Sequence, residues 1–160
     1  MNGFYWLIPK VLAGSSRPGG RSGNAKESAQ LETDLRWLRN QNIDAILTLT
    51  EVGLDQDLID RFGFINLHIP IIDMTAPSSS EISDALAFID QQTARGRSVV
   101  VHCLVGQGRT GTMLAAYLIR TGLSPELAIS DLRSVCPHAV ENTLQERALV
   151  EFAARRDWVI

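Results

Sequence analysis

Residues 98–111 read SVVVHCLVGQGRTG, and this stretch decides the fold. The β-branched run Ser98–His102 predicts a buried strand. A loop with two glycines follows at residues 103–108, and Arg109 opens a helix that we expect to end at Arg120. Backbone N–H groups of such a loop converge above a helix N-terminus, where the macrodipole favours negative charge. The stretch therefore predicts an anion-binding loop between a strand and a helix.

Cys103 and Arg109 are the candidate reactive and anion-binding side chains of this loop. A thiol in the field of a helix N-terminus loses its proton more readily than a free thiol, and the resulting thiolate is a nucleophile. The planar guanidinium of Arg109 can hold two oxygens of a phosphate. Gly106 and Gly108 permit a positive φ, which turns backbone amides inward. A buried structural cysteine would explain Cys103 alone, but it would not explain the whole pattern.

Residues 106–111 also spell G-x-G-x-x-G, the pattern of a dinucleotide-binding loop. That pattern requires a second strand after the helix, with an acidic residue at its end. Residues 112–135 instead predict helix, turn and helix, and Asp131 falls inside a helical pattern. We therefore expect no dinucleotide at this loop.

The rest of the chain alternates predicted strands with predicted helices, which indicates an α/β domain with a largely parallel sheet. Apolar runs predict strands at residues 4–12, 43–49 and 64–70. The Gly- and Ser-rich segment at residues 14–23 predicts a surface loop. Helical spacing and capping residues predict helices at 28–40, 57–62, 80–95, 124–135 and 142–156.

Length and charge exclude several classes of protein. The chain has 160 residues, so we expect one domain that covers residues 1–160. It has 15 basic and 18 acidic residues, without the basic excess typical of nucleic-acid-binding proteins. The apolar run at residues 4–8 is too short to span a membrane. Two cysteines exclude a disulfide scaffold and indicate a reduced, cytoplasmic setting. We find no metal-ligand spacing and expect neither metal ion nor cofactor.

The segment HCLVGQGRTG at residues 102–111 resembles the HCxxGxxRTG signature of cysteine-dependent protein tyrosine phosphatases. The small size of the chain resembles the compact atypical dual-specificity phosphatases. Further segments are similar to the same proteins: LAGSSRP at 12–18, LTLTE at 47–51, HIP at 68–70 and QER at 145–147. The resemblance implies a single compact domain with a central, mostly parallel sheet flanked by helices. The phosphate-binding loop would lie between a buried strand and a helix N-terminus.

The resemblance also implies roles for the residues of the loop. Cys103 would attack phosphorus and form a phosphocysteine. Thr110 would donate a hydrogen bond to the sulfur and ease its departure in the second step, and His102 would fix the backbone of Cys103. The side chain of Arg109 and the backbone amides of the loop would hold the equatorial oxygens of the phosphate. The residues that give these amides are Leu104, Val105, Gly106, Gln107, Gly108 and Arg109.

A carboxylic acid must give a proton to the leaving group. The resemblance places it about thirty residues before the cysteine, which favours Asp73, although an aspartate before Ser and Pro also forms turns. Glu141 is the second candidate for this acid. In the alternative interpretation, Glu141 only stabilises the N-terminus of the last helix. Gln145 either positions the hydrolytic water or caps the last helix. Arg17 and Arg21 are interpreted as solvated loop charges rather than as contacts to an anionic substrate.

We expect the substrate to be a phosphorylated protein or peptide, with phosphotyrosine preferred and phosphoserine and phosphothreonine also accepted. An aryl oxygen leaves more readily than an alkyl one. The variable loop positions 104, 105 and 107 hold no lysine, which argues against an inositol lipid. We expect a monomer that binds neither nucleic acid nor membrane. The alternative function is a catalytically weak module that keeps the loop and binds phosphoproteins.

Overall fold

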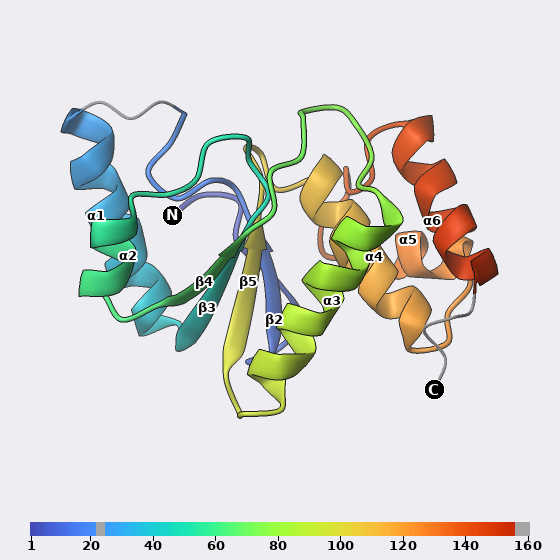
Figure 1. The fold of residues 1–160 in the computed structure, drawn as a ribbon, viewed down its shortest axis with the longest axis horizontal. Coiled ribbons are helices and arrows are strands. Elements are labelled where there is room, and N and C mark those ends of the chain that lie inside the picture. Colours follow the sequence, from blue (N-terminus) through green and yellow to red (C-terminus); the bar gives the residue numbers. More distant parts are fainter. Residues whose placement is uncertain (22–24, 156–160) are drawn as a thin grey trace.

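The computed structural model describes residues 1–21 and 25–155, and a five-stranded sheet forms its centre (Figure 1). The strand order is β1-β2-β5-β3-β4. β1 pairs antiparallel with β2, and the other neighbours are parallel. The mostly parallel sheet expected from the sequence is therefore confirmed. The strands are β1 (Tyr5–Ile8), β2 (Leu12–Ser15), β3 (Ile43–Thr48), β4 (Ile65–His68) and β5 (Ser98–His102).

Helices cover both faces of this sheet (Figure 1). Successive side chains of a strand point to opposite faces, so β5 feeds two separate cores. Val100 packs in the cluster on the side of α1, whereas Val99 and Val101 pack in the cluster on the side of α3 and α4. The helices are α1 (Ala25–Asn40), α2 (Gln56–Arg61), α3 (Ser79–Thr93), α4 (Gly108–Arg120), α5 (Pro125–Arg133) and α6 (Thr143–Arg155).

The first strand predicted from the sequence, residues 4–12, is wrong as a single element. The chain reverses after β1 and returns as β2, with Lys10 at a φ of 61° in the turn. The Val11 N–H donates to the Ile8 carbonyl across this turn at 3.0 Å. Neither Pro9 nor Lys10 belongs to the Gly- and Asn-rich pairs that mark a hairpin in a sequence. The sequence pattern therefore does not predict the antiparallel pair of strands at the edge of the sheet.

The surface loop predicted at residues 14–23 also begins too early. Gly14 and Ser15 belong to β2 and are buried, while residues 22–24 lie outside the described part of the chain. The ring of Tyr5 lies against Gly14, where a Cβ would overlap the ring. This glycine provides a close approach between two strands, and not the flexibility that its neighbours suggested.

Helix boundaries follow the capping residues more closely than the apolar pattern. Ser78, rather than Ser80, caps α3, and its hydroxyl and the Glu81 carboxylate form a reciprocal capping box. Ser124 caps α5, with Pro125 at the first helical position as predicted. α6 ends at Arg155 among the described residues, and the predicted end at residue 156 lies outside them.

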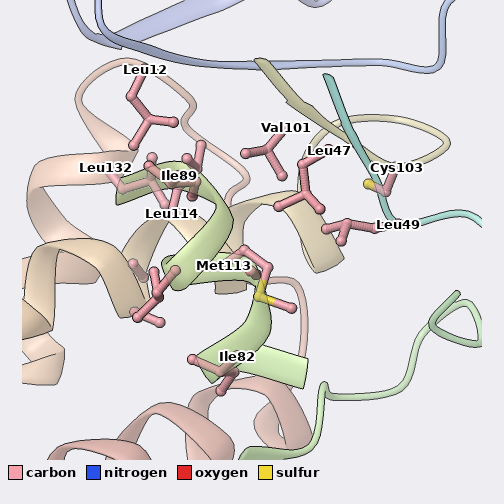
Figure 2. Packing of buried hydrophobic residues seen from close by; sticks show 14 of the residues in the cluster. Leu12, Leu47, Leu49, Ile82, Ile89, Val101, Cys103, Met113, Leu114 and Leu132 are labelled. Atoms are coloured by element: carbon pink, nitrogen blue, oxygen red, sulfur yellow. The ribbon is translucent and has the colours of Figure 1, made fainter. Parts of the chain in front are cut away.

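The carboxyl ends of β3, β4 and β5 meet at one edge of the sheet, where an α/β fold places its ligand site (Figure 1). Figure 2 shows Cys103 beside Leu49 at the margin of the core, directly beyond β5. α4 begins at this edge and runs back along the sheet. Among the described residues, no helix combines the length and the apolar character needed to cross a membrane.

Candidate phosphate-binding site

Cys103 lies at the end of β5 with 3% of its surface exposed. The Gly106 N–H donates to Cys103 Sγ at 3.3 Å. Gly106 has a φ of 85°, and a Cβ there would lie 2.5 Å from the carbonyl carbon of Ser15. Only glycine fits this turn, so the residue type dictates the close return of the loop around the sulfur. An N–H aimed at sulfur stabilises the thiolate form.

The N-terminus of α4 faces the same loop. Its N-cap residue is Gln107, whose side chain makes no capping hydrogen bond. The first amides of the helix are thus not satisfied by a cap, unlike those of α3 and α5. The hydroxyl of Thr110, in the first turn, is buried and has no hydrogen-bond partner among the described residues. Of the predicted donors of residues 104–110, the Gly106 N–H contacts the sulfur, and the roles of the others stay predictions.

Arg109 is buried, with 2% of its side chain exposed, yet it carries a charge into the site. Its Nη1 donates to the Ile71 carbonyl at 2.8 Å and to Glu51 Oε2 at 3.0 Å. Its Nη2 pairs with Asp73 Oδ1 at 3.0 Å. Its Nε is buried and has no partner among the described residues. A buried donor without a partner costs free energy, and an oxyanion on the Nε side would remove that cost.

Glu51 joins the candidate nucleophile loop to the candidate acid, and sequence reasoning gave it no role. Its Oε1 accepts the Asp73 N–H at 2.8 Å, while its Oε2 accepts from Arg109. The hydrogen bond from the Asp73 backbone is the largest cause that lowers the pKa of Glu51, and Arg109 adds to it. Glu51 therefore stays charged and holds both partners. The LTLTE segment at 47–51 was the available signal, but its contacts are more than twenty residues away.

Asp73 meets the site as the sequence predicted, on the loop that follows β4. Its carboxylate is half exposed, and the adjacent Met74 has a φ of 63°. The start of α6 holds this loop from the other side. Asn142 Nδ2 donates to the Met74 carbonyl at 3.0 Å, and Gln145 Nε2 donates to the Thr75 carbonyl at 3.3 Å. The position of Asp73 thus depends on the last helix.

Glu141 and Gln145 lie beside Gly108, at the start of α4. The carboxylate of Glu141 sits against Gly108, where a Cβ would overlap Oε2. Gln145 is fully buried, and its backbone N–H donates to Asn142 Oδ1 at 3.0 Å, so Asn142 caps the helix. Its Oε1 accepts the Glu141 N–H at 2.8 Å. The capping interpretation of Gln145 is therefore seen in the contacts, while a role in positioning water stays a prediction.

His102 is completely buried behind the loop. Its Nδ1 lies 3.2 Å from the Cys103 carbonyl oxygen, and its Nε2 lies 2.9 Å from Thr48 Oγ1. These partners suit a neutral ring that donates from Nδ1 and accepts the Thr48 hydroxyl at Nε2. Burial lowers the pKa of His102 to about 3, against the opposing effect of the Cys103 carbonyl. The ring can fix the Cys103 backbone without carrying charge.

We expect the free energy of unfolding to fall as the pH drops from about 6.5, the usual pKa of histidine, towards 3. Between these two pH values His102 binds a proton in the unfolded chain but not in the folded protein, so a lower pH favours unfolding. One such group contributes a slope of about 1.4 kcal/mol per pH unit. Urea unfolding at several pH values measures this slope. The His102→Asn variant should be less stable but show a flatter slope, and an unchanged slope would contradict the assignment.

Tyr5 supports the loop from β1, and sequence reasoning missed it. Its hydroxyl donates to the Gly106 carbonyl at 2.8 Å, and burial raises the pKa of Tyr5, so the donor stays protonated. The C=O and the following N–H of a trans peptide point in opposite directions. A Gly106 carbonyl that is held outwards by Tyr5 therefore turns the Gln107 N–H inwards, towards the anion position.

We expect Tyr5→Phe to weaken inhibition by vanadate about five- to tenfold, since one hydrogen bond that orients the loop is lost. The inhibition constant against an aryl phosphate measures the effect. Tyr117→Phe is the matched control, because Tyr117 lies on α4 with Arg120 over its ring. Equal inhibition constants in Tyr5→Phe and the wild type would show that the hydroxyl does not orient the loop.

A cavity of about 460 Å³ opens beside Arg109. It is lined by Arg17, Arg21, Thr50, Glu51, Val52, Asp73, Leu104 and Arg109. The interpretation of Arg17 as a solvated loop charge is wrong, because its guanidinium donates to three oxygens of residues 50–53.

The G-x-G-x-x-G pattern at residues 106–111 lacks the strand that a dinucleotide-binding loop requires, as the sequence predicted. The helix α4 leads to the helix α5, and Asp131 lies inside α5. Among the described residues, no group of three or more metal-ligating side chains occurs.

A cysteine behind a buried strand, a glycine-shaped loop and a buried arginine at a helix N-terminus define the class of cysteine-dependent phosphatases. The family model described as "Polymorphic toxin system, DSP-PTPase phosphatase" matches residues 20–123, which include Asp73 and the whole loop. The chain therefore belongs to this family of DSP-PTPase phosphatases.

Curated relatives and a solved structure agree with this assignment. The chain is 36% identical over 125 residues to phosphatidylglycerophosphate phosphatase PTPMT1 of Arabidopsis thaliana, covering 75% of the chain and 37% of the relative. It is 30% identical over 125 residues to the mouse phosphatidylglycerophosphatase and protein-tyrosine phosphatase 1, covering 73% and 65%. The chain thus spans less than two thirds of these relatives. The crystal structure of Tk-PTP in the active form is similar with a TM-score of 0.83, 29% identity and coverage of 96% and 98%.

Proposed function

We propose that this protein hydrolyses phosphomonoesters without a metal ion, through a phosphocysteine intermediate on Cys103. The observation that carries the proposal is the buried Arg109, whose Nε has no partner among the described residues beside a loop that aims an N–H at the Cys103 sulfur. A phosphate oxygen satisfies that Nε. The same arrangement suits a trigonal-bipyramidal phosphoryl group, because its equatorial oxygens face the loop amides and the guanidinium.

The first step forms the S–P bond and breaks the P–O bond to the leaving group. Cys103 Sγ supplies the electron pair, and the leaving oxygen takes a proton from Asp73. The free Nε and the adjacent Nη2 of Arg109 form the fork that binds two phosphate oxygens. Asp73 now occupies Nη2, so substrate displaces its carboxylate towards the leaving group. In the second step water attacks phosphorus, gives a proton to Asp73 and releases the sulfur, with Thr110 donating to it.

We expect Asp73→Asn to lower kcat by about 10²-fold, because the leaving oxygen loses its proton donor. The loss should be largest for aryl phosphates whose phenols are weak acids. The basic limb of the pH profile of kcat, where a general acid loses its proton, checks this with two such esters. Glu141→Gln is the competing variant, since Glu141 sits against Gly108. If Glu141→Gln shows the leaving-group-dependent loss and Asp73→Asn does not, Glu141 is the acid.

The proposed function is tested by hydrolysis of p-nitrophenyl phosphate in EDTA with a reducing agent. A burst of nitrophenolate equal to the enzyme concentration, and a phosphoryl group on Cys103 by mass spectrometry of quenched protein, are the expected results. Iodoacetate should inactivate the enzyme, and phosphate should protect it. An absence of turnover, with phosphate still bound, would leave the alternative of a phosphoprotein-binding module.

For the physiological substrate, the proposal is phosphotyrosine in a protein, because the phenolate is the better leaving group. A second candidate is a lipid phosphomonoester, because two curated relatives are named as phosphatidylglycerophosphate phosphatases. Comparison of a phosphotyrosine peptide with phosphatidylglycerophosphate in detergent micelles separates the two. The free cysteines Cys103 and Cys136 support a reducing, cytoplasmic setting.

A further inference from the structure

A groove of about 740 Å³ lies between the edge strand β4 and α3, and the proposed chemistry does not use it (Figure 1). One side of the groove is formed by residues 67–70, at the end of β4 and just beyond it. The other side is formed by one face of α3, since its residues repeat at intervals of three and four. These residues are Glu81, Asp84, Ala87, Phe88 and Gln91.

The strand side of the groove has an open edge. Among the described residues, β4 is the last strand of the sheet and pairs only with β3. The Ile69 N–H donates to the Thr48 carbonyl at 2.9 Å, and alternate residues of a parallel strand direct their backbone polar groups to opposite sides. The N–H and C=O groups of Asn66 and His68 therefore face away from β3. Such an edge beside a helix can pair with an extended segment of another chain.

The helix side of the groove is acidic. Among the described residues, the exposed carboxylate of Asp84 makes neither a hydrogen bond nor an ion pair. Glu81 Oε2 accepts the Ser78 N–H at 2.6 Å, and Glu81 forms no ion pair with a described residue. No lysine or arginine lines the groove, and the His68 ring places its Nε2 2.7 Å from the Thr50 carbonyl oxygen. The two negative charges are thus left for a cationic partner.

Apolar surface lies next to these carboxylates. Phe88 belongs to the core on the side of α3 and still lines the groove, together with Leu67 and Ile69. The side chains of lysine and arginine pack their apolar stems against such surface while their charged ends stay in water or meet a carboxylate. The groove therefore favours a basic side chain over an acidic or a purely apolar one.

We propose that this groove binds an extended segment of the substrate protein that carries lysine or arginine near the phosphotyrosine. The inference rests on the proposed function and adds a docking site for its substrate. Pro70 lines the groove, and Asp73 lines the cavity beside Arg109 three residues later. Three residues span at most about 10 Å, so one short peptide can occupy the cavity and the groove together.

Three phosphotyrosine peptides test the groove. They differ only at two adjacent positions, which hold Lys, Ala or Glu, and these positions are placed four or six residues before or after the phosphotyrosine. At the best placement we expect wild-type kcat/KM to be about tenfold higher for the Lys peptide than for the Ala peptide, and lowest for the Glu peptide. This Lys/Ala ratio should fall as salt is added. Equal values for Lys and Ala at every placement, or a preference for Glu, overturn the proposal.

Three variants locate the effect. Asp84→Lys should lower the Lys/Ala ratio to one or below, because the charge that meets lysine is reversed. Ala87→Trp should lower the ratio to about one by filling the groove from an exposed helical position. Asp131→Lys makes the same exchange on α5, away from β4, and should keep the wild-type ratio (Figure 1). A ratio that stays at the wild-type value in both Asp84→Lys and Ala87→Trp overturns the proposal.

Two further measurements separate the docking site from other outcomes. Hydrolysis of p-nitrophenyl phosphate by the wild type shows independently whether the proposed function holds. If it does not, the ratio of the Kd values of the same labelled peptides, from fluorescence anisotropy, decides the docking proposal with the same variants. Sedimentation of the wild type and Ala87→Trp identifies a second copy of the chain as the occupant. A dimer that only Ala87→Trp disrupts, with no change in the Lys/Ala ratio, overturns the assignment to substrate.

Discussion

Cys103→Ser is expected to lower the hydrolysis of aryl phosphates by more than about 10⁴-fold, to the background of the assay. The contact seen at Cys103 Sγ is the Gly106 N–H, which stabilises an anion but removes no proton. A serine hydroxyl therefore stays protonated and attacks poorly, whereas a thiol is a much stronger acid than a hydroxyl and its thiolate is the better nucleophile. The exchange of sulfur for oxygen is small, so the fold and the anion loop should persist.

Steady-state kinetics of Cys103→Ser measures this effect, with calorimetric titration of phosphate to show that the loop is intact. Cys136→Ser is the matched control. Cys136 is also buried, its Sγ lies 3.9 Å from the Gly106 carbonyl, and burial raises the pKa of its thiol. We expect this variant to keep its activity within a few-fold. More than 1 part in about 100 of wild-type activity in Cys103→Ser would rule out the proposed nucleophile.

Arg109→Lys is expected to lower kcat/KM about 10³-fold. Lysine keeps one positive charge, but its ammonium cannot present the planar Nε–Nη2 edge to two oxygens. The side chain is buried, so water cannot replace the lost hydrogen bonds. The carboxylates of Glu51 and Asp73 also lose a partner that holds them on either side of the cavity.

The kinetics of Arg109→Lys should be compared with those of Arg120→Lys. Arg120 lies at the other end of α4, where it pairs with Asp90 on the surface. The same exchange there should change kcat/KM less than about twofold, as is usual for exposed pairs. If Arg109→Lys kept a tenth or more of the wild-type kcat/KM, bidentate binding by Arg109 would not explain the chemistry.

The part of the fold that sequence reasoning predicted well is the part with a local signal. The run Ser98–His102 is rich in β-branched residues and is buried on both faces, and the glycines after it fit one loop geometry. The strand, the loop and the helix could therefore all be predicted from the sequence. The turn at Lys10 has no such signal, because its positive φ is adopted by a residue that rarely takes it. Gly14 was misread because the reason for that glycine is the ring of Tyr5, nine residues earlier.

The same limit explains what was missed in the candidate site. Cys103 and Arg109 lie six residues apart, and their spacing predicts the roles that we propose for them. The contacts of Tyr5 with Gly106 and of Glu51 with Arg109 join residues 101 and 58 positions apart. Such pairs exist only after the sheet has brought its carboxyl edge together. The contacts of Arg17 with residues 50–53 depend on the same geometry, so the sequence alone indicates only an ordinary loop cation.

The hold of α6 on the loop after β4 has a consequence for the order in which the site is completed. Asn142 and Gln145 contact the carbonyls of Met74 and Thr75, which neighbour Asp73. A ribosome delivers Cys103, Arg109 and Asp73 well before it delivers residues 141–155. The nascent chain can thus build its anion loop early, while the loop that carries Asp73 gains these two anchors only after the start of α6 has been synthesised.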